Sequence, residues 1–292
     1  MQATALLELG TALVHTTRGF DDEGAVVLRQ SCEAATKVGA NLISASALRE
    51  LGYVDALAGR RPSAEATLRE ALAQAGSDPD ALAGIHSVIG FNLVGWGKAD
   101  VGLDHFAQAI GHARSVGNQR KEAWALGIGA WGHLQTGDID GARDWLDRCE
   151  ALCSASRWLS FLPWVRALTI EAQLGKRSLS QVKADAERVF ATSCQMGDPC
   201  WEAASARALA LCAEAEGSGD AARDWMHEAE RRGTRVTDGW AGLNVANLAE
   251  RVRLGRRYGT AEESGELARR LIEAAARTHA DQYLRKAVDW LA

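Results

Sequence analysis

The sequence of 292 residues lacks features that several classes of protein require. It has only four prolines, and no stretch approaches the ~18 consecutive apolar residues that a membrane-spanning helix needs. The N-terminal residues MQATALLELG also lack the charged start, apolar middle and cleavage site of a signal peptide. We therefore expect a cytoplasmic protein without a membrane partner.

The sequence has neither a strong excess of one sign of charge nor the cysteine pattern of a disulfide-bonded protein. The 33 Lys and Arg residues nearly balance the 38 Asp and Glu residues, and no long run of one sign occurs. Direct binding to nucleic acid is not expected, because it needs a concentrated basic face. The six cysteines are scattered through alanine-rich sequence, which is typical of reduced thiols and not of a disulfide scaffold.

What the sequence does contain is a repeat. A glycine ends one apolar segment, a few polar residues follow, and a small or short residue opens the next segment. Residues four and seven positions further on are mostly apolar, so they form one stripe on a helix. Counting back twelve positions reaches a second small or apolar residue on a preceding helix, so each unit is predicted to be a helical hairpin. The opening residues stand 38 or 40 positions apart, at Gly24, Ala64, Gly102, Ala142, Val182 and Ala222.

Composition and prolines agree with an all-α chain. Ala, Leu, Glu and Arg dominate, and these are strong helix formers. Pro79 and Pro199 each follow an aspartate that can cap a helix, so both fit the first helical position. We expect a single domain over residues 1–292. Its seven hairpins are predicted at 3–39, 41–75, 79–116, 119–155, 158–195, 199–233 and 238–277, followed by a terminal helix over 280–291.

The pattern of small residues resembles the tetratricopeptide repeat (TPR). The match is good in the second unit, at Leu48, Leu51, Gly52, Ala64, Leu68 and Ala71. The family's repeat is about 34 residues long, whereas the spacing here is about 40. The resemblance implies a right-handed α-α superhelix, or solenoid, of about seven hairpins. Long repeats of this kind are similar to the sensor regions of bacterial signalling ATPases, transcription regulators and nucleotide cyclases.

Motifs that suggest chemistry are weak. Residues 127–132 spell G-x-G-x-x-G, but they lie inside a predicted helix and not after a strand, so they are interpreted as packing glycines. Cys149 with Cys153, and His105 with His112, form pairs without the further ligands that a zinc site needs. No serine lies in a nucleophile-elbow pattern. We therefore predict no enzyme activity, no catalytic residue, no cofactor and no metal.

Aromatic residues form the clearest candidate site. The chain has ten tryptophans, against eight Phe and Tyr residues together. Tyr53, Phe91 and Trp131 occupy the same offset in consecutive first helices, and Trp124 and Trp164 occupy the offset seven residues earlier. The TPR resemblance implies that first helices line the concave surface, where such rings suit an apolar peptide. The same stripe also fits simple packing between hairpins, which is the commoner use of aromatics at helical spacing.

The leading hypothesis is a non-enzymatic module that binds a protein or peptide on its concave face, as a sensory or scaffolding part of a bacterial signalling or transcription-regulatory system. The alternatives are a small-molecule receptor with a Trp-lined pocket and a self-associating spacer. The candidate ligand-binding residues are Tyr53, Phe91, Trp124, Trp131 and Trp164 as apolar anchors, with Arg49, Gln135, Glu171 and Arg207 as polar ones.

Three further expectations concern partners. The Asn and Lys/Arg pattern of the TPR carboxylate clamp is missing from the middle units, so a C-terminal carboxylate ligand is disfavoured. The first hairpin has apolar positions and no polar capping helix before it, which is typical of a piece cut from a larger multidomain protein. A homodimer is left open.

Overall fold

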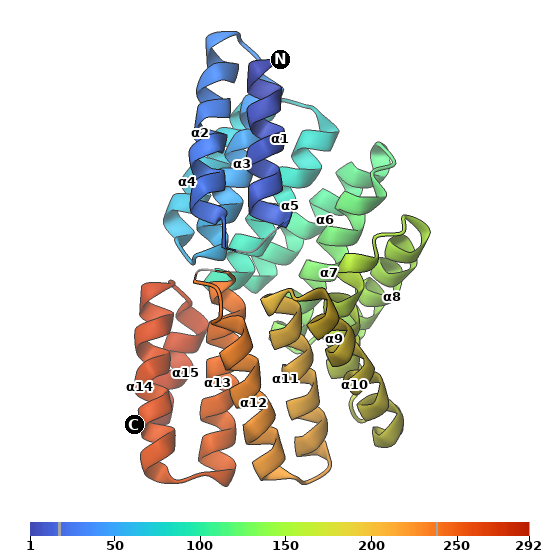
Figure 1. The fold of residues 1–292 in the computed structure, drawn as a ribbon, viewed down its shortest axis with the longest axis vertical. Helices are drawn as coiled ribbons and strands as arrows, with labels where there is room; N and C mark the ends of the chain where they lie inside the picture. The colour runs from blue at the N-terminus through green and yellow to red at the C-terminus, as the bar shows by residue number, and fades with distance from the viewer. Residues whose placement is uncertain (17–18, 238, 292) are drawn as a thin grey trace.

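The computed structural model describes residues 1–16, 19–237 and 239–291. Within these ranges the chain forms fifteen α-helices and one short 3-10 helix, and it forms no strand. Figure 1 shows the helices stacked along a curved path from the N-terminus to the C-terminus. The predicted right-handed α-α superhelix is confirmed. None of the helices in the described part of the chain has the length and apolar character needed to cross a membrane.

Consecutive helices of the described ranges pair into seven hairpins, and a single helix follows them. The pairs are α1 (Gln2–Thr16) with α2 (Asp21–Lys37), α3 (Asn41–Leu57) with α4 (Arg61–Ala75), α5 (Pro79–Trp96) with α6 (Ala99–Ser115), α7 (Gln119–Thr136) with α8 (Ile139–Ala155), α9 (Leu162–Gln173) with α10 (Leu179–Met196), α11 (Pro199–Ala215) with α12 (Gly219–Gly233), and α13 (Ala241–Tyr258) with α14 (Ala261–Arg277). The last helix is α15 (Asp281–Leu291), and the 3-10 helix η1 (Leu159–Phe161) precedes α9.

Small residues lie where the two helices of a hairpin touch. In the third hairpin, a Cβ atom at Gly90 would lie 2.8 Å from the carbonyl oxygen of Gly102 and 2.9 Å from the ring of Phe106. The residues that correspond to Gly102 in the neighbouring hairpins are Ala64 and Ala142, and both are fully buried. Because backbone and large side chains fill this space, only a residue with little or no side chain allows the helices to approach so closely.

Turns between hairpins use the left-handed backbone conformation. Gly117 and Gly197 have φ angles of 69° and 75°. Arg157 stands midway between them in the sequence and has a φ of 54°, and His279 has a φ of 51° after α14. A side chain with a Cβ atom is disfavoured at these angles, so Arg157 and His279 mark two strained turns.

The two ends of the superhelix meet. A Cβ atom at Gly59 would lie 2.6 Å from the Cβ atom of Thr278, so the α3–α4 turn packs against the residue that ends α14. Gln282 packs on Gly97, and its Nε2 donates a hydrogen bond to Oε1 of Gln135 at 2.6 Å. Figure 1 shows the C-terminal helices lying directly below the N-terminal ones. The superhelix therefore encloses an interior space.

The fifth hairpin is the least regular. Its first helix, α9, has 12 residues, whereas the first helices of the other hairpins have 15 to 18. The two helices of this hairpin also pack less closely than those of the other hairpins. A groove lies between α8 and α10 at this hairpin, and η1 lies at the edge of the interior space.

Candidate functional site

A cavity of about 590 Å³ lies inside the superhelix. Its walls come from the first helices α1, α3, α5, α7 and α11, from η1, and from Trp240 just before α13. This volume is typical of sites for small molecules and short peptide segments. Because segments far apart in the sequence form it, the cavity exists only when the superhelix has closed.

One wall of the cavity is a continuous cluster of aromatic rings. The ring centroid of Phe91 lies 5.5 Å from that of Tyr53 and 5.3 Å from that of Trp240. Trp124 completes this part of the wall, with its ring 6.0 Å from Tyr53 and 6.1 Å from Phe91. Phe161 and Trp201 continue the wall. Rings at these separations hold one another in place, so the wall is a rigid apolar surface.

Next to these rings lies a charged wall that centres on Glu50. This carboxylate is buried, and it accepts hydrogen bonds from the guanidinium of Arg49 and from Nε2 of His15, the latter at 2.9 Å. Burial by itself would raise the pKa of Glu50. The positive charges of Arg49 and His15 outweigh this effect and lower the pKa to about 2. Glu50 is therefore ionised, and both of its oxygens are engaged.

Two cations reach the cavity beside Glu50. Arg49 lies across α5 at Gly84, where a Cβ atom would come within 2.9 Å of the arginine Cδ. Lys121, on α7, contacts Asp80 through its ammonium group, at 2.7 Å from Oδ2 and 2.7 Å from the carbonyl oxygen. Burial lowers the pKa of Lys121; the hydrogen bond to Asp80 opposes this, and the charge of Arg49 adds to it. Arg49 and Lys121 therefore both bring positive charge to the cavity.

The structure divides the nine predicted ligand-binding residues into three groups. Arg49, Tyr53, Phe91 and Trp124 line the cavity. Trp131 and Gln135 line a void of about 20 Å³ that shares Phe91 and Trp240 with the cavity. The remaining three residues, Trp164, Glu171 and Arg207, are not among those that line either space.

Trp164 requires a correction. It is fully buried, its indole nitrogen donates a hydrogen bond to the carbonyl oxygen of Gly127 at 2.9 Å, and the ring of Trp240 lies 4.7 Å from it. An enclosed ring presents no surface to a ligand, so Trp164 belongs to the core. The sequence left open whether the aromatic rings line a concave surface or pack between hairpins. In the structure some of these rings line the cavity, whereas Trp164 packs in the core.

Glu171 and Arg207 also have a different environment from the one expected. The guanidinium of Arg207 donates two hydrogen bonds to the Glu171 carboxylate, at 3.1 and 3.2 Å. Burial by itself would lower the pKa of Arg207, but Glu171 and Glu250 outweigh it and raise the pKa. These side chains satisfy each other between hairpins, away from the cavity.

Sequence reasoning missed other residues of the cavity. Lys121, Phe161 and Trp201 lie 40 residues apart and begin or precede three consecutive first helices. The positions expected on the concave surface covered only two turns of each first helix, and these three residues lie one turn before them. Extending the 40-residue spacing by one turn toward the N-terminus of each first helix would have found all three. The other missed lining residues include His15, Glu50, Trp158 and Trp240.

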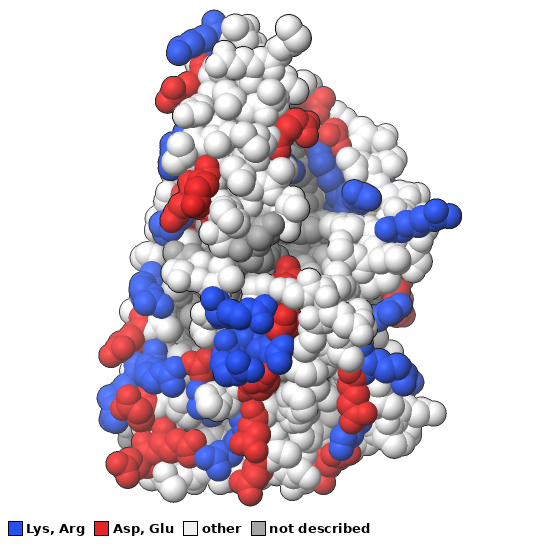
Figure 2. Space-filling view, viewed as in Figure 1, with Lys and Arg blue, Asp and Glu red and all other residues white. Residues whose placement is uncertain are grey.

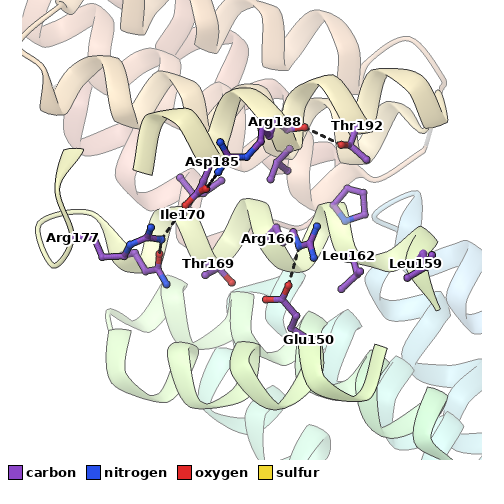
Figure 3. A pocket seen from close by; sticks show the side chains of 13 residues that line it. Glu150, Leu159, Leu162, Arg166, Thr169, Ile170, Arg177, Asp185, Arg188 and Thr192 are labelled. Atoms are coloured by element: carbon purple, nitrogen blue, oxygen red, sulfur yellow. Dashed lines mark hydrogen bonds and ion pairs between the residues drawn. The ribbon is translucent and has the colours of Figure 1, made fainter. Parts of the chain in front are cut away.

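A larger groove, of about 720 Å³, lies between α8 and α10 over α9. Figure 3 shows that Arg166 pairs with Glu150 on one side and that Arg177 and Arg188 meet Asp185 on the other. Its described lining residues include no aromatic side chain and none of the nine predicted residues. The interior cavity is therefore the better candidate site.

Comparisons with known proteins support the fold. No family model matches this chain, and no curated protein matches it. Among solved structures, a Rap protein complexed with competence and sporulation factor has a TM-score of 0.74 and 12% identity, covering 98% of this chain and 79% of its own. NprR in complex with its cognate peptide NprX has a TM-score of 0.71 and 12% identity, covering 99% of this chain and 83% of its own.

A third solved structure contains the same arrangement within a larger protein. It is a signal transduction ATPase with a tetratricopeptide repeat sensor from Pyrococcus horikoshii, with a TM-score of 0.58 and 12% identity. The match covers 99% of this chain and 42% of that protein. This chain has the fold of TPR-like helical repeat proteins.

Proposed function

We propose that this chain is a non-enzymatic binding module that holds a short peptide segment in its interior cavity. The observation that supports this most directly is the cavity itself: an aromatic wall lies beside a charged wall inside a closed superhelix. The fold is that of proteins solved with competence and sporulation factor and with the peptide NprX. The module would serve as the sensory or scaffolding part of a bacterial signalling or transcription-regulatory system, in the cytoplasm, and its six free cysteines fit a reducing compartment.

Binding would use burial of apolar surface. An aromatic side chain of the ligand that removes about 150 Å² from water against Tyr53, Phe91 and Trp124 gains about 4 kcal/mol before the cost of immobilisation. The charged wall would then orient the ligand. Because Trp240 directly precedes α13, a ligand that contacts this ring would also favour one position of the C-terminal hairpins over others.

A second candidate is a small-molecule receptor. The cavity volume of about 590 Å³ favours it, because a metabolite would be enclosed on most sides in a space of this size. Attachment to a larger protein and self-association are compatible with either function.

Isothermal titration with pooled synthetic peptides and with a metabolite panel separates the two candidates. We expect binding from the peptide pool that is lost in Trp124→Ala and kept in Leu159→Ala, a matched change at the groove outside the cavity. Tight binding of one metabolite with none of the peptides would replace the first proposal by the second. Binding that survives Trp124→Ala unchanged would contradict both.

A further inference from the structure

The charged wall of the cavity has acidic groups that are already engaged. Both oxygens of Glu50 accept hydrogen bonds from Arg49 and His15. Asp198, which also lines the cavity, accepts hydrogen bonds at Oδ1 from the backbone nitrogens of Cys200 and Trp201 and so caps α11. A ligand that enters the cavity therefore meets carboxylates that already accept hydrogen bonds from the protein.

The cations of the same wall retain donors. A guanidinium has five N–H donors, and the Nε of Arg49 is buried without a hydrogen-bond partner among the described residues. An ammonium group has three, and two of those on Lys121 are directed to Asp80. Arg120 also lines the cavity, with its guanidinium 6.0 Å from the ring of Trp158. The cavity thus has unused donors with positive charge close to an aromatic wall.

Gly84 is the residue that allows this arrangement. Arg49 starts on α3, and its side chain crosses α5 where Gly84 has no Cβ atom to block it. Arg49 thereby lines the same cavity as Lys121 on α7. Glu50 and Asp80 already pair with these two cations, so a ligand carboxylate would use the donors that remain on them.

We propose that the peptide ligand presents a carboxylate to Arg49 and Lys121 while an aromatic or large apolar side chain of the same ligand packs on Trp124, Tyr53 and Phe91. This inference rests on the proposed function and adds the chemical class of the ligand. The carboxylate is either the C-terminus of the peptide or an acidic side chain next to the aromatic one. The sequence alone disfavoured a C-terminal carboxylate ligand, because the clamp pattern is missing at the inward offsets of the middle units; Lys121 lies one turn before those offsets.

Matched pairs of probes test the proposal. N-acetyl-tryptophan has a free carboxylate, whereas N-acetyl-tryptophanamide has a neutral amide in the same place. A second pair, N-acetyl-Trp-Glu-amide and N-acetyl-Trp-Gln-amide, moves the carboxylate to a side chain. Titration calorimetry or saturation-transfer NMR on the full chain is expected to show at least a ten-fold preference for the acid in one of the two pairs. The pair that shows the preference identifies the source of the carboxylate.

Three variants identify the responsible residues. Lys121→Gln removes one cation, and Gly84→Ala displaces Arg49 without changing any charge. Each should reduce the preference for the acid to about two-fold or less while leaving the neutral probe unaffected. Arg166→Gln, at the groove outside the cavity, is the matched control and should keep the full preference.

The outcomes separate this inference from the proposed function. If acid and amide bind equally, and both are lost in Trp124→Ala, the carboxylate is wrong and the aromatic site stands. If no probe binds at millimolar concentration while peptides from the pool do bind, the carboxylate inference is again overturned. If the preference persists in both Lys121→Gln and Gly84→Ala, it arises from other residues and the assignment fails.

Discussion

Two regions of the superhelix use one repeat geometry for different chemistry. Around the interior cavity, residues about one repeat apart meet as aromatic rings, as Tyr53 and Phe91 do in the N-terminal half and Trp201 and Trp240 do in the C-terminal half. Outside the cavity, in the C-terminal half, they meet as ion pairs: Arg253 with Glu214 and Arg270 with Glu230 are 39 and 40 residues apart. Figure 2 shows acidic and basic side chains interleaved over the C-terminal helices and a largely uncharged surface over the N-terminal ones.

The difference shows what each contact leaves available. An ion pair between two hairpins uses part of the donors and acceptors of both side chains, so it joins the hairpins and leaves only the remaining groups for a third molecule. In the aromatic wall Tyr53 and Phe91 are nearly buried, whereas Trp124 and Trp201 remain partly exposed and can accept a ligand. The repeat determines which residues of adjacent hairpins become neighbours. Their side chains determine whether the contact only joins the hairpins or also leaves surface for a ligand.

The largest expected effect separates two tryptophans at the same offset in neighbouring hairpins. Trp164→Ala should destabilise the fold by about 4 kcal/mol, because a fully buried ring and its hydrogen bond are lost. Urea denaturation measures this change. An equal loss of stability in Trp124→Ala, whose ring is only partly buried, would contradict the distinction between lining and core.

An acid titration compares the charged groups of the two halves. Glu50 has a pKa of about 2, below its ordinary value of 4.5, so its stabilising effect is complete above that value and is lost as the pH falls toward 2. The shift corresponds to about 3 kcal/mol. The difference in unfolding free energy between wild type and Glu50→Gln should therefore shrink on acidification from pH 6 to pH 2.5, roughly the range over which the group titrates.

Glu228 provides the C-terminal control for that titration. Hydrogen bonds from Arg231, and then from Arg232, lower its pKa to about 2, although burial opposes them. Arg231 is largely exposed, so salt screens this contact more than it screens buried Glu50. High salt should reduce the effect of Glu228→Gln on stability and leave that of Glu50→Gln nearly unchanged; equal salt dependence would remove the contrast between the halves.

A smaller effect is expected on binding. Trp124→Ala should weaken the peptide ligand by about 2 kcal/mol, or roughly 30-fold, because it removes a central aromatic anchor. The melting temperature should change little. Calorimetric titration and a thermal scan of the same variant provide both values, and a collapse of melting would assign Trp124 to the core.

The smallest expected effect is at a turn. Arg157→Gly should stabilise the fold by up to about 1 kcal/mol, because glycine adopts the φ of 54° without steric cost and loses only part of that gain to chain entropy. His279→Gly is the matched test in the C-terminal half, where the same residue also contacts Trp96. A gain at Arg157 with a loss at His279 would indicate that the strained turn near the closing contact contributes to holding the ends together.

Much of the fold could be predicted because close contact between the two helices of a hairpin requires small residues at fixed positions in the sequence. These residues recur, for example at Gly102 and Ala142, and their spacing predicts where the helices lie. The candidate site could be predicted only in part. Tyr53 and Phe91 follow the repeat and line the cavity, whereas Lys121 and Trp240 line it from positions that the repeat offsets did not include.

By itself, the sequence determined that this chain is a stack of helical hairpins with a row of aromatic rings on their first helices, since periodic spacing is a property of neighbours along the chain. Only the tertiary structure decided which rings remain open. Trp124 and Trp164 have the same offset, yet Trp240, more than seventy residues further on, covers the second and not the first. Curvature of the superhelix determines this contact, because it brings Trp240 against a hairpin two repeats earlier, which spacing along the chain does not specify.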